Sequence, residues 1–324
     1  MSGRLSYRDA GVDVAAAERF VAAIGPLVRS TQSEAVVVHS SRFAGLIRPD
    51  LAGMADPLIA ATCDGVGTKV LLATEPAHYE GLGQDLVAMN VNDLLPLGAR
   101  PLLFLDYLAA GRLDPERLQA AVAGIAAACR EAGCALLGGE TAEMPDVHEP
   151  DTVEMVGFAV GLVDASRLPD PSAIRPGDPV AALPSTGLHS NGFTLARRAL
   201  DRAGHRLDER FDDGTLGDAL REPTAIYVDP VLAIDFKAAA HITGGGLVSR
   251  TTAMLPEGLG MRLDPGGWTR HPVFDLIAAA GMVEPGEMAR TFNMGLGFVT
   301  IVEEVPDGWL HVGEVTDGGG VTIG

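Results

Sequence analysis

Four short turns that contain glycine are the places where this chain could hold a phosphate group. Each lies beside an apolar segment typical of a strand, and they span residues 64–69, 138–144, 187–192 and 243–246. Glycine lets the backbone approach a ligand closely, and the exposed N–H groups of such turns bind anions. None is a Walker loop or a Gly-x-Gly-x-x-Gly fingerprint. A lone turn usually only ends a strand, but four turns with charged or hydroxyl residues favour a phosphate site.

Carboxylates near these turns suggest a divalent cation. Asp64 ends an apolar strand, and Asp106 interrupts another. Asn90 and Asp93 lie one turn apart on a predicted helix whose neighbouring stripe is apolar. A buried carboxylate is costly unless it meets a cation or a hydrogen-bond donor, and oxygen ligands of this kind suit magnesium together with ATP oxygens. Taken singly, each acid is more often a helix cap or an ion-pair partner, so only the combination indicates a metal.

Lys69 is one of only two lysines in the chain, the other being Lys237. It stands two residues after Gly67, and a lysine that follows a glycine turn can meet a phosphate as a point charge. The alternative is an ordinary exposed lysine.

The turn over residues 187–192 precedes a predicted helix over 191–203. Ser190 or Asn191 can cap that helix, whose N-terminus would then direct N–H groups at a nearby anion. The alternative is a pure cap with His189 at the surface. The spacing reveals no Ser-His-Asp arrangement and no cysteine in basic surroundings, so nucleophilic hydrolysis is not favoured.

The elements that must position these groups alternate between helices and strands. Helices are predicted over residues 14–30, 82–98, 115–132, 191–203, 230–239 and 273–280. Strands are predicted over 36–38, 58–63, 102–108, 135–137, 153–163, 180–183 and 297–302. This mixture indicates an α/β or α+β class. Four prolines between residues 169 and 179 predict a boundary between a domain over 1–167 and another over 168–324.

Composition limits the possible partners. The 324 residues are 47% apolar and 21% charged, which fits a globular protein of about two domains. A net charge of −19 repels nucleic acid and anionic membranes, so neither is expected as a partner, and any phosphate site must be built locally. The three cysteines have no paired Cys-x-x-Cys spacing, which disfavours a disulfide framework or a zinc site. The chain shows no apolar signal region and no apolar run of about 20 residues, so we expect a cytoplasmic protein.

Taken together, the motifs resemble those of the phosphoribosylformylglycinamidine cyclo-ligases, also called aminoimidazole ribonucleotide synthetases. The matching segments follow the family in order: 7–13 (Tyr-Arg-Asp-Ala-Gly-Val-Asp), 64–69, 83–94, 104–107, 138–145, 187–192, 241–246 and 291–295. The match covers nearly the whole chain. The sequence departs from the family in lacking a glycine upstream of Phe43, and residues 303–313 leave little room for the usual C-terminal helix.

The resemblance implies a reaction and an assembly. ATP would drive the cyclisation of formylglycinamidine ribonucleotide to aminoimidazole ribonucleotide in purine biosynthesis, with release of ADP and phosphate. Residues 1–167 would form the ATP-binding, metal-binding and dimerisation domain, whose mixed sheet pairs with its copy in a homodimer. Residues 168–324 would form a C-terminal α/β sandwich.

The resemblance also implies roles for individual residues. Asp64 and Asp93 would bind magnesium. The residues expected to take part in catalysis are Asp64, Lys69, Asp93, Glu140 and His189. Those expected to bind the nucleotide or the substrate are Gly65, Gly67, Thr68, Asp106, Thr141, Glu143, Ser190 and Asn191.

Several alternatives stay open. Selenophosphate synthetase would need a reactive cysteine near the N-terminus, but the first cysteine here is Cys63. Thiamine-monophosphate kinase and the hydrogenase-maturation relative lack the full set of motifs. A formylglycinamidine ribonucleotide synthetase-like enzyme depends on a glutamine amidotransferase, whose nucleophilic cysteine is not evident. The altered segment before Phe43 is the one feature that favours a non-catalytic binding paralogue.

Overall fold

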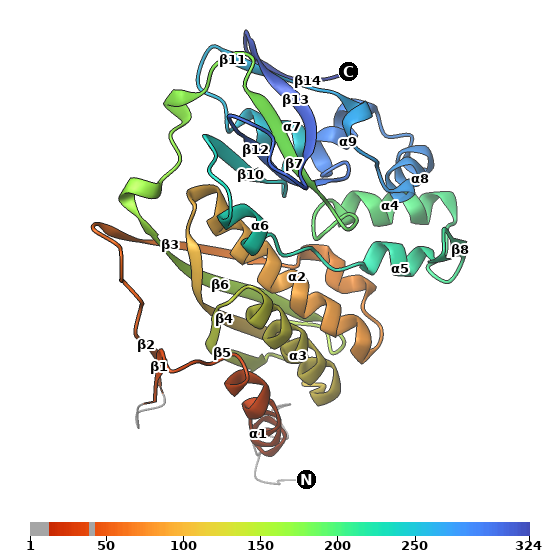
Figure 1. Ribbon diagram of the computed structural model, residues 1–324. Coiled ribbons are helices and arrows are strands. Elements are labelled where there is room, and N and C mark those ends of the chain that lie inside the picture. Colours follow the sequence, from red (N-terminus) through yellow and green to blue (C-terminus); the bar gives the residue numbers. More distant parts are fainter. Residues whose placement is uncertain (1–12, 39–42) are drawn as a thin grey trace, which may run out of the picture.

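The computed structural model describes residues 13–38 and 43–324. Most of the predicted signature over residues 7–13, and the part of the altered segment over 39–42, therefore lie outside the described residues. Figure 1 shows two helix-covered sheets, one built by each half of the chain. This arrangement confirms the predicted mixture of α and β structure. Within the described part of the chain, no helix has the length and apolar character needed to cross a membrane.

The N-terminal half is built on a four-stranded mixed sheet with the order β3-β6-β4-β5. Its strands are β3 (Pro57–Gly65), β4 (Arg100–Ala110), β5 (Ala135–Glu143) and β6 (Val153–Asp164). Strand β6 runs antiparallel to both of its neighbours, while β4 and β5 are parallel. The helices α2 (Pro76–Leu94) and α3 (Pro115–Glu131) cover one face, and α1 (Val14–Arg29) packs on α3 (Figure 1). A short hairpin pairs β1 (Val36–Val37) with β2 (Leu46–Ile47).

The predicted ends of α3 are confirmed. The Asp114 side chain accepts hydrogen bonds from the backbone N–H groups of Glu116 and Arg117, and Pro115 occupies the first turn. Its predicted apolar face is buried: Leu118, Val122, Ile125 and Cys129. Helix α2 crosses α3 at glycine on both sides, since a Cβ at Gly83 or Gly124 would collide with the backbone of the other helix. This close crossing fixes α2, which carries Asn90, Asn92 and Asp93.

The C-terminal half is built on a six-stranded sheet with the order β10-β12-β7-β13-β11-β14. Its strands are β7 (Pro179–Pro184), β10 (Ala238–His241), β11 (Leu259–Leu263), β12 (Leu296–Ile301), β13 (Leu310–Asp317) and β14 (Gly320–Ile323). Its helices are α4 (Phe193–Ala203), α5 (Leu216–Arg221), α6 (Val228–Leu232), α7 (Gly246–Thr252), α8 (Pro272–Gly281) and α9 (Pro285–Thr291), and a two-stranded ribbon joins β8 (Arg210–Phe211) to β9 (Gly214–Thr215). Figure 1 shows α5 and α6 between the two halves.

One predicted helix is wrong. Residues 230–239 were expected to be helical, but α6 ends at Leu232 and strand β10 begins at Ala238. The run of three alanines has high helix propensity, yet these residues pair with β12 from Ala238 to His241. Pairing and burial at this end of the sheet therefore override local propensity. The correction matters because it places His241 at the end of a strand that faces the N-terminal half.

Candidate functional site

Three of the four glycine turns converge where the two halves of the molecule meet. The first and third turns lie next to each other. The hydroxyl oxygen of Thr68, in the first turn, lies 3.0 Å from that of Thr194, which follows the third turn. These two turns line one open cleft with a volume of about 530 Å³, whose walls are Gly67, Thr68, Ser190, Asn191, Gly192, Phe193, Thr194, Leu195, Arg198 and Thr291. A Cβ on Gly244, in the fourth turn, would lie 3.6 Å from the side-chain oxygen of Asn191. Four of the predicted site residues therefore share a single cleft.

The N-terminus of α4 lies in this cleft without a side-chain cap. The predicted cap at Ser190 or Asn191 is wrong, because the N-cap residue is Gly192, whose φ of 79° lies in the left-handed region. A side chain at this position would also collide with the ring of Phe292, so glycine is required here. Ser190 is buried, and its hydroxyl has no hydrogen-bond partner among the described residues. Uncapped N–H groups beside an unpartnered hydroxyl are groups that can donate hydrogen bonds to an anion.

Asp64 and Asp93 lie close together beside these turns. Asn90 joins their elements: its side-chain oxygen accepts from the Asp64 N–H at 2.9 Å, and its amide nitrogen donates to the Asp64 carbonyl at 3.2 Å. Burial raises the pKa of Asp64, and the nearby carboxylate of Asp93 raises it further, while the Gly65 N–H, His241 and Arg250 oppose that shift. Asp64 is thus a partly buried carboxylate that a cation would stabilise.

Asp93 contacts the C-terminal half directly. Its carboxylate oxygen Oδ1 lies 2.8 Å from Nδ1 of His241, and the exposed fraction of its side chain is 31%. Within the ranges 13–38 and 43–324, no three His, Cys, Asp or Glu side chains converge to form a complete metal site. A metal at Asp64 and Asp93 would therefore need ligand atoms from the substrate or from water.

Lys69 lies in a different environment from the one predicted. Its side chain is 1% exposed, and its ammonium group lies 2.7 Å from Oδ2 and 2.9 Å from Oδ1 of Asp85. It also donates to the Glu222 carbonyl at 2.8 Å, and it lies 5.6 Å from the ring centre of Phe193. A phosphate could contact this ammonium only if the buried pair broke. The geometry therefore gives Lys69 a structural position beneath the first residue of α4.

His189 is buried rather than at the surface. Its φ of 62° is left-handed, and its Nε2 accepts a hydrogen bond from the Thr186 N–H at 3.2 Å. Burial lowers the pKa of His189, and the neighbouring His241 and Lys69 lower it further. A neutral ring that accepts at Nε2 carries its proton on Nδ1, which has no partner in the described structure. The ring therefore holds the turn in shape, and it is not among the residues that line the cleft.

The remaining predicted residues lie elsewhere on the N-terminal sheet. Register places Asp64, Gly157, Asp106 and Gly139 side by side on the four strands. Adjacent strands are about 4.8 Å apart, so Asp106 lies roughly 10 Å from Asp64 along this row. Asp106 is half-buried on the helix-covered face, where burial raises its pKa to about 7.

The second glycine turn, over residues 138–144, belongs largely to β5, at the opposite edge of the sheet from β3. Glu140 is exposed and pairs in register with Tyr107, one row beyond Asp106, while Thr141 pairs with Leu108. The carboxylate of Glu143 accepts from the backbone N–H groups of Asp13 at 3.1 Å and Leu113 at 2.8 Å. Within one chain, these residues are not brought together with Asp64 and Asp93.

Sequence reasoning missed several residues of the site. Thr194 and Arg198 stand in the first turns of α4, on the side that lines the cleft. They are four residues apart, just after a predicted helix start, and this spacing places them on one face of the helix, a signal that could have identified them. His241 belongs to the motif over residues 241–246, but its partner Asp93 is 148 residues away. Sequence alone did not indicate that contact.

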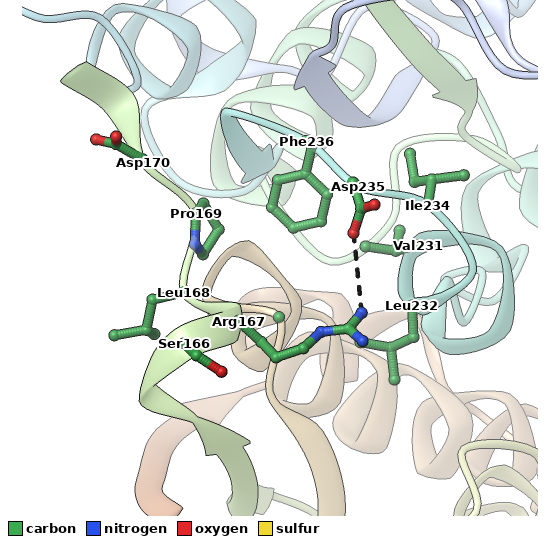
Figure 2. Close-up of a pocket in the computed structure, with 11 residues that line it drawn as sticks. Ser166, Arg167, Leu168, Pro169, Asp170, Val231, Leu232, Ile234, Asp235 and Phe236 are labelled. Atoms are coloured by element: carbon green, nitrogen blue, oxygen red, sulfur yellow. Dashed lines mark ion pairs between the residues drawn. The ribbon is translucent and has the colours of Figure 1, made fainter. Parts of the chain in front are cut away.

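A second pocket lies at the connection between the halves. Figure 2 shows Arg167 and Asp235 pointing toward each other across it, at 3.8 Å in an exposed ion pair. Its volume is about 390 Å³, and its walls combine the connection over 166–170 with residues 231–236. None of the predicted site residues lines it, so the cleft at α4 is the better candidate for chemistry. The predicted boundary after residue 167 falls in this connection and stays a prediction.

Comparison with known proteins is consistent with this arrangement. A family model described as "AIR synthase related protein, N-terminal domain" matches residues 44–163, and one described as "AIR synthase related protein, C-terminal domain" matches residues 175–323. A phosphoribosylformylglycinamidine cyclo-ligase from Nitratidesulfovibrio vulgaris is 45% identical over 92% of this chain and 87% of its own length. Another from an Anaeromyxobacter species is 47% identical over 95% of this chain and 91% of its own length.

Solved structures share the fold at low sequence identity. A thiamine-monophosphate kinase from Stenotrophomonas maltophilia superposes with a TM-score of 0.68 at 18% identity, covering 93% of this chain and 95% of its own. The hydrogenase maturation protein HypE in complex with ATP gives 0.67 at 20% identity, covering 97% of this chain and 93% of its own. At such identities the likeness establishes the fold and leaves the reaction to other evidence.

Proposed function

The chain belongs to the AIR synthase related protein family, and we propose that it catalyses the ATP-dependent cyclisation of formylglycinamidine ribonucleotide to aminoimidazole ribonucleotide. It is an enzyme of purine biosynthesis that forms a C–N bond. The observation that carries this function is the extent of the match: more than nine-tenths of the chain aligns with cyclo-ligases at 45% and 47% identity. We place the enzyme in the cytoplasm, with its metabolite substrates.

The chemistry requires activation of a poor leaving group. The γ-phosphoryl group of ATP passes to the formyl oxygen of the substrate, and ADP leaves. The amidine nitrogen then attacks the formyl carbon, a C–N bond forms, the C–O bond breaks, and phosphate leaves while the nitrogen loses a proton. The protein contributes chiefly by positioning the two substrates and by neutralising charge.

We assign the metal position to Asp64 and Asp93. Their oxygen donors fit magnesium, and because burial and the neighbouring Asp93 raise the pKa of Asp64, a cation beside it would stabilise its charged form. Bound there, magnesium would offset the negative charge of the ATP phosphates. The superfamily includes a protein solved in complex with ATP, which supports ATP use at this fold. The Gly65 backbone N–H lies beside these acids and donates to Oδ1 of Asp64 at 2.7 Å.

We assign a phosphate position to the uncapped N-terminus of α4. The Ser190 hydroxyl, the Thr68–Thr194 hydroxyl pair and the Arg198 guanidinium line the same cleft. Backbone N–H groups at a helix N-terminus stabilise anions, and arginine adds a positive charge in a protein of net charge −19. A phosphorylated substrate is thus held by local groups against the repulsion of the whole surface.

We also propose a homodimer formed through the open face of the N-terminal sheet. This face carries apolar side chains that one chain leaves exposed, among them Ile59 at 75%, Phe158 at 38% and Tyr107 at 37%. Glu140 lies on the same face, beside Tyr107. Exposed apolar surface of this kind marks an interaction site. Sedimentation of the wild type should show a dimer and that of Ile59→Asp a monomer; a monomeric wild type at micromolar concentration would contradict the proposal.

The decisive experiment is an assay of the purified chain with ATP, magnesium and formylglycinamidine ribonucleotide. ADP and aminoimidazole ribonucleotide should appear in equal amounts. Turnover of ATP without ring closure would reject the assignment. A parallel reaction with formylglycinamide ribonucleotide and ammonia tests the synthetase-like alternative, and no product is expected there. A chain that binds ATP but converts neither substrate would instead indicate a non-catalytic paralogue.

A further inference from the structure

We propose that His241 is a positioning residue that holds the carboxylate of Asp93 through a hydrogen bond from Nδ1, and that Asn92 fixes the required tautomer of the ring. The functional part of this inference rests on the proposed role of Asp93 in binding the metal. The structural part, the position of the proton on the ring, stands on the contacts alone.

The orientation of the Asn92 amide is fixed by two backbone groups. Its side chain is buried, its Oδ1 accepts from the Tyr227 N–H at 2.9 Å, and its Nδ2 donates to the Ala225 carbonyl at 2.8 Å. A flipped amide would set two donors against each other at Tyr227 and two acceptors against each other at Ala225. The atom that faces His241 is therefore the nitrogen, which is a donor.

This donor determines where the His241 ring carries its proton. The Asn92 Nδ2 lies 3.5 Å from Nε2 of His241, which is a long hydrogen-bond distance. If Nε2 carried a proton, two N–H donors would face each other and repel, so Nε2 is the acceptor. A neutral ring that is unprotonated at Nε2 carries its proton on Nδ1. That nitrogen lies 2.8 Å from Oδ1 of Asp93, so it donates to the carboxylate.

The ring cannot turn away from this arrangement. The His241 side chain is 1% exposed. Its ring stacks on Phe298 with centroids 6.5 Å apart and an interplanar angle of 23°, and it meets Tyr227 edge-on at 6.5 Å and 65°. Strand pairing places His241 directly opposite Phe298. The C-terminal sheet thus delivers a rigid donor to a side chain of the N-terminal half.

As a consequence, Oδ1 of Asp93 accepts a hydrogen bond from His241, while the side chain remains partly exposed to solvent. A carboxylate held at Oδ1 presents its other oxygen in a defined direction, which lowers the cost of ordering it around a ligand. The same hydrogen bond links α2 to β10, so the docking of the two halves sets the direction of the acid.

The structural part is tested by the ¹⁵N spectrum of the full chain with labelled histidine. Of its eight histidines, His241 is identified by the signals that disappear in His241→Asn. We expect a protonated Nδ1 and an unprotonated Nε2. A ring protonated at Nε2 would overturn the tautomer assignment, and this readout does not depend on any catalytic activity.

The positioning part is tested by the magnesium concentration that gives half-maximal rate. His241→Ala should raise it about tenfold, whereas His241→Asn, whose amide can donate from near the position of Nδ1, should raise it about threefold or less. If both variants lost the same stability and neither changed its magnesium requirement, His241 would serve only in packing, and the positioning role would be rejected. His205→Ala is the matched control, because His205 pairs with Glu209 at 2.6 Å outside the site, and its magnesium requirement should not change. A wild type that shows the expected spectrum but no cyclisation would instead reject the proposed function.

Discussion

Two charged pairs near the junction of the halves differ in how accessible their charged groups are. Lys69 and Asp85 are 1% and 0% exposed, and the ammonium group contacts both oxygens of the carboxylate. Asp93 is 31% exposed and is held through one oxygen by His241. The enclosed pair also receives the N–H and hydroxyl of Thr224 at 2.8 and 2.6 Å. This pair is enclosed by protein, whereas Asp93 keeps surface that a ligand could reach.

The difference shows that a charged residue beside a glycine turn is not sufficient evidence of ligand binding. Lys69 follows the Gly67 turn, yet its charge is satisfied within the protein. Burial lowers the pKa of Lys69, while Asp85 opposes that shift. Losing one partner of such a pair leaves an uncompensated buried charge, which costs more than the pair itself contributes. We therefore expect mutation of the Lys69–Asp85 pair to lower mainly the stability, and mutation of Asp93 to lower mainly the catalytic rate.

The largest expected effect is on stability. Lys69→Met should lower the free energy of unfolding by about 3–5 kcal/mol, because Asp85 would remain buried without its cation. Lys69→Met combined with Asp85→Asn should recover part of that loss, since the charge is gone while Thr224 keeps an acceptor. Urea denaturation measures both. Lys237→Met is the control: its pair with Asp178 is more accessible, with both side chains 15% exposed, and its loss should be clearly smaller. If Lys69→Met were stable but inactive, the structural role would be wrong, and a role for Lys69 in binding phosphate would be supported instead.

The second effect is on catalysis. Asp93→Asn should lower kcat/KM about 100-fold or more, equivalent to ~2.7 kcal/mol, because a neutral amide binds a divalent cation poorly. It should also raise the magnesium concentration needed for half-maximal rate, while the urea midpoint changes little. Steady-state assays over a magnesium series give both quantities. The exposed Asp235→Asn serves as the control. An unchanged magnesium requirement in Asp93→Asn would place the metal elsewhere.

Local patterns predicted the main elements of the N-terminal half, but they missed β11, β13 and β14 of the C-terminal sheet, which are defined by pairing across the chain. Asp114 and Pro115 begin α3, and its apolar spacing gives the buried face, because caps and periodicity act within a few residues. The alanine run after residue 237 was misread, since its conformation depends on pairing with β12. The same holds for the cap of α4, where contact with Phe292 requires a glycine at position 192.

The sequence allowed the turns of the site to be predicted, but not the distances and contacts between their side chains. The spacing identified Asp64, Asp93, Thr68 and Ser190, which the structure places around the junction of the halves. The environment of Lys69 depends on the Glu222 carbonyl, 153 residues away. No local pattern encodes such a contact, so burial could not be distinguished from phosphate binding in advance.

A third, smaller effect concerns the cation in the open cleft. Arg198 is exposed and lines the cleft at the N-terminus of α4. Arg198→Ala should raise the KM of a phosphorylated substrate about tenfold, or ~1.4 kcal/mol, with little change in kcat, since it removes an attraction common to ground state and transition state. Arg206→Ala is the control, because its ion pair with Asp208 is exposed and outside the cleft. A fall in kcat at constant KM would indicate that Arg198 acts on the reacting phosphoryl group instead.

The smallest effect is a pH dependence of stability that distinguishes Asp106 from the acids of the site. Burial raises the pKa of Asp106 from 3.8 to about 7. Between those values the native state binds more protons than the unfolded state, so the free energy of unfolding falls as pH rises through this window and levels off above it. Asp106→Asn should flatten this fall between about pH 5 and pH 7, measured by urea denaturation at each pH. Asp64 shares the upward shift but lies at the proposed metal position, so saturating magnesium should remove its contribution and leave that of Asp106. An identical slope in wild type and Asp106→Asn, with magnesium present, would mean that this carboxyl group is already ionised in the folded protein.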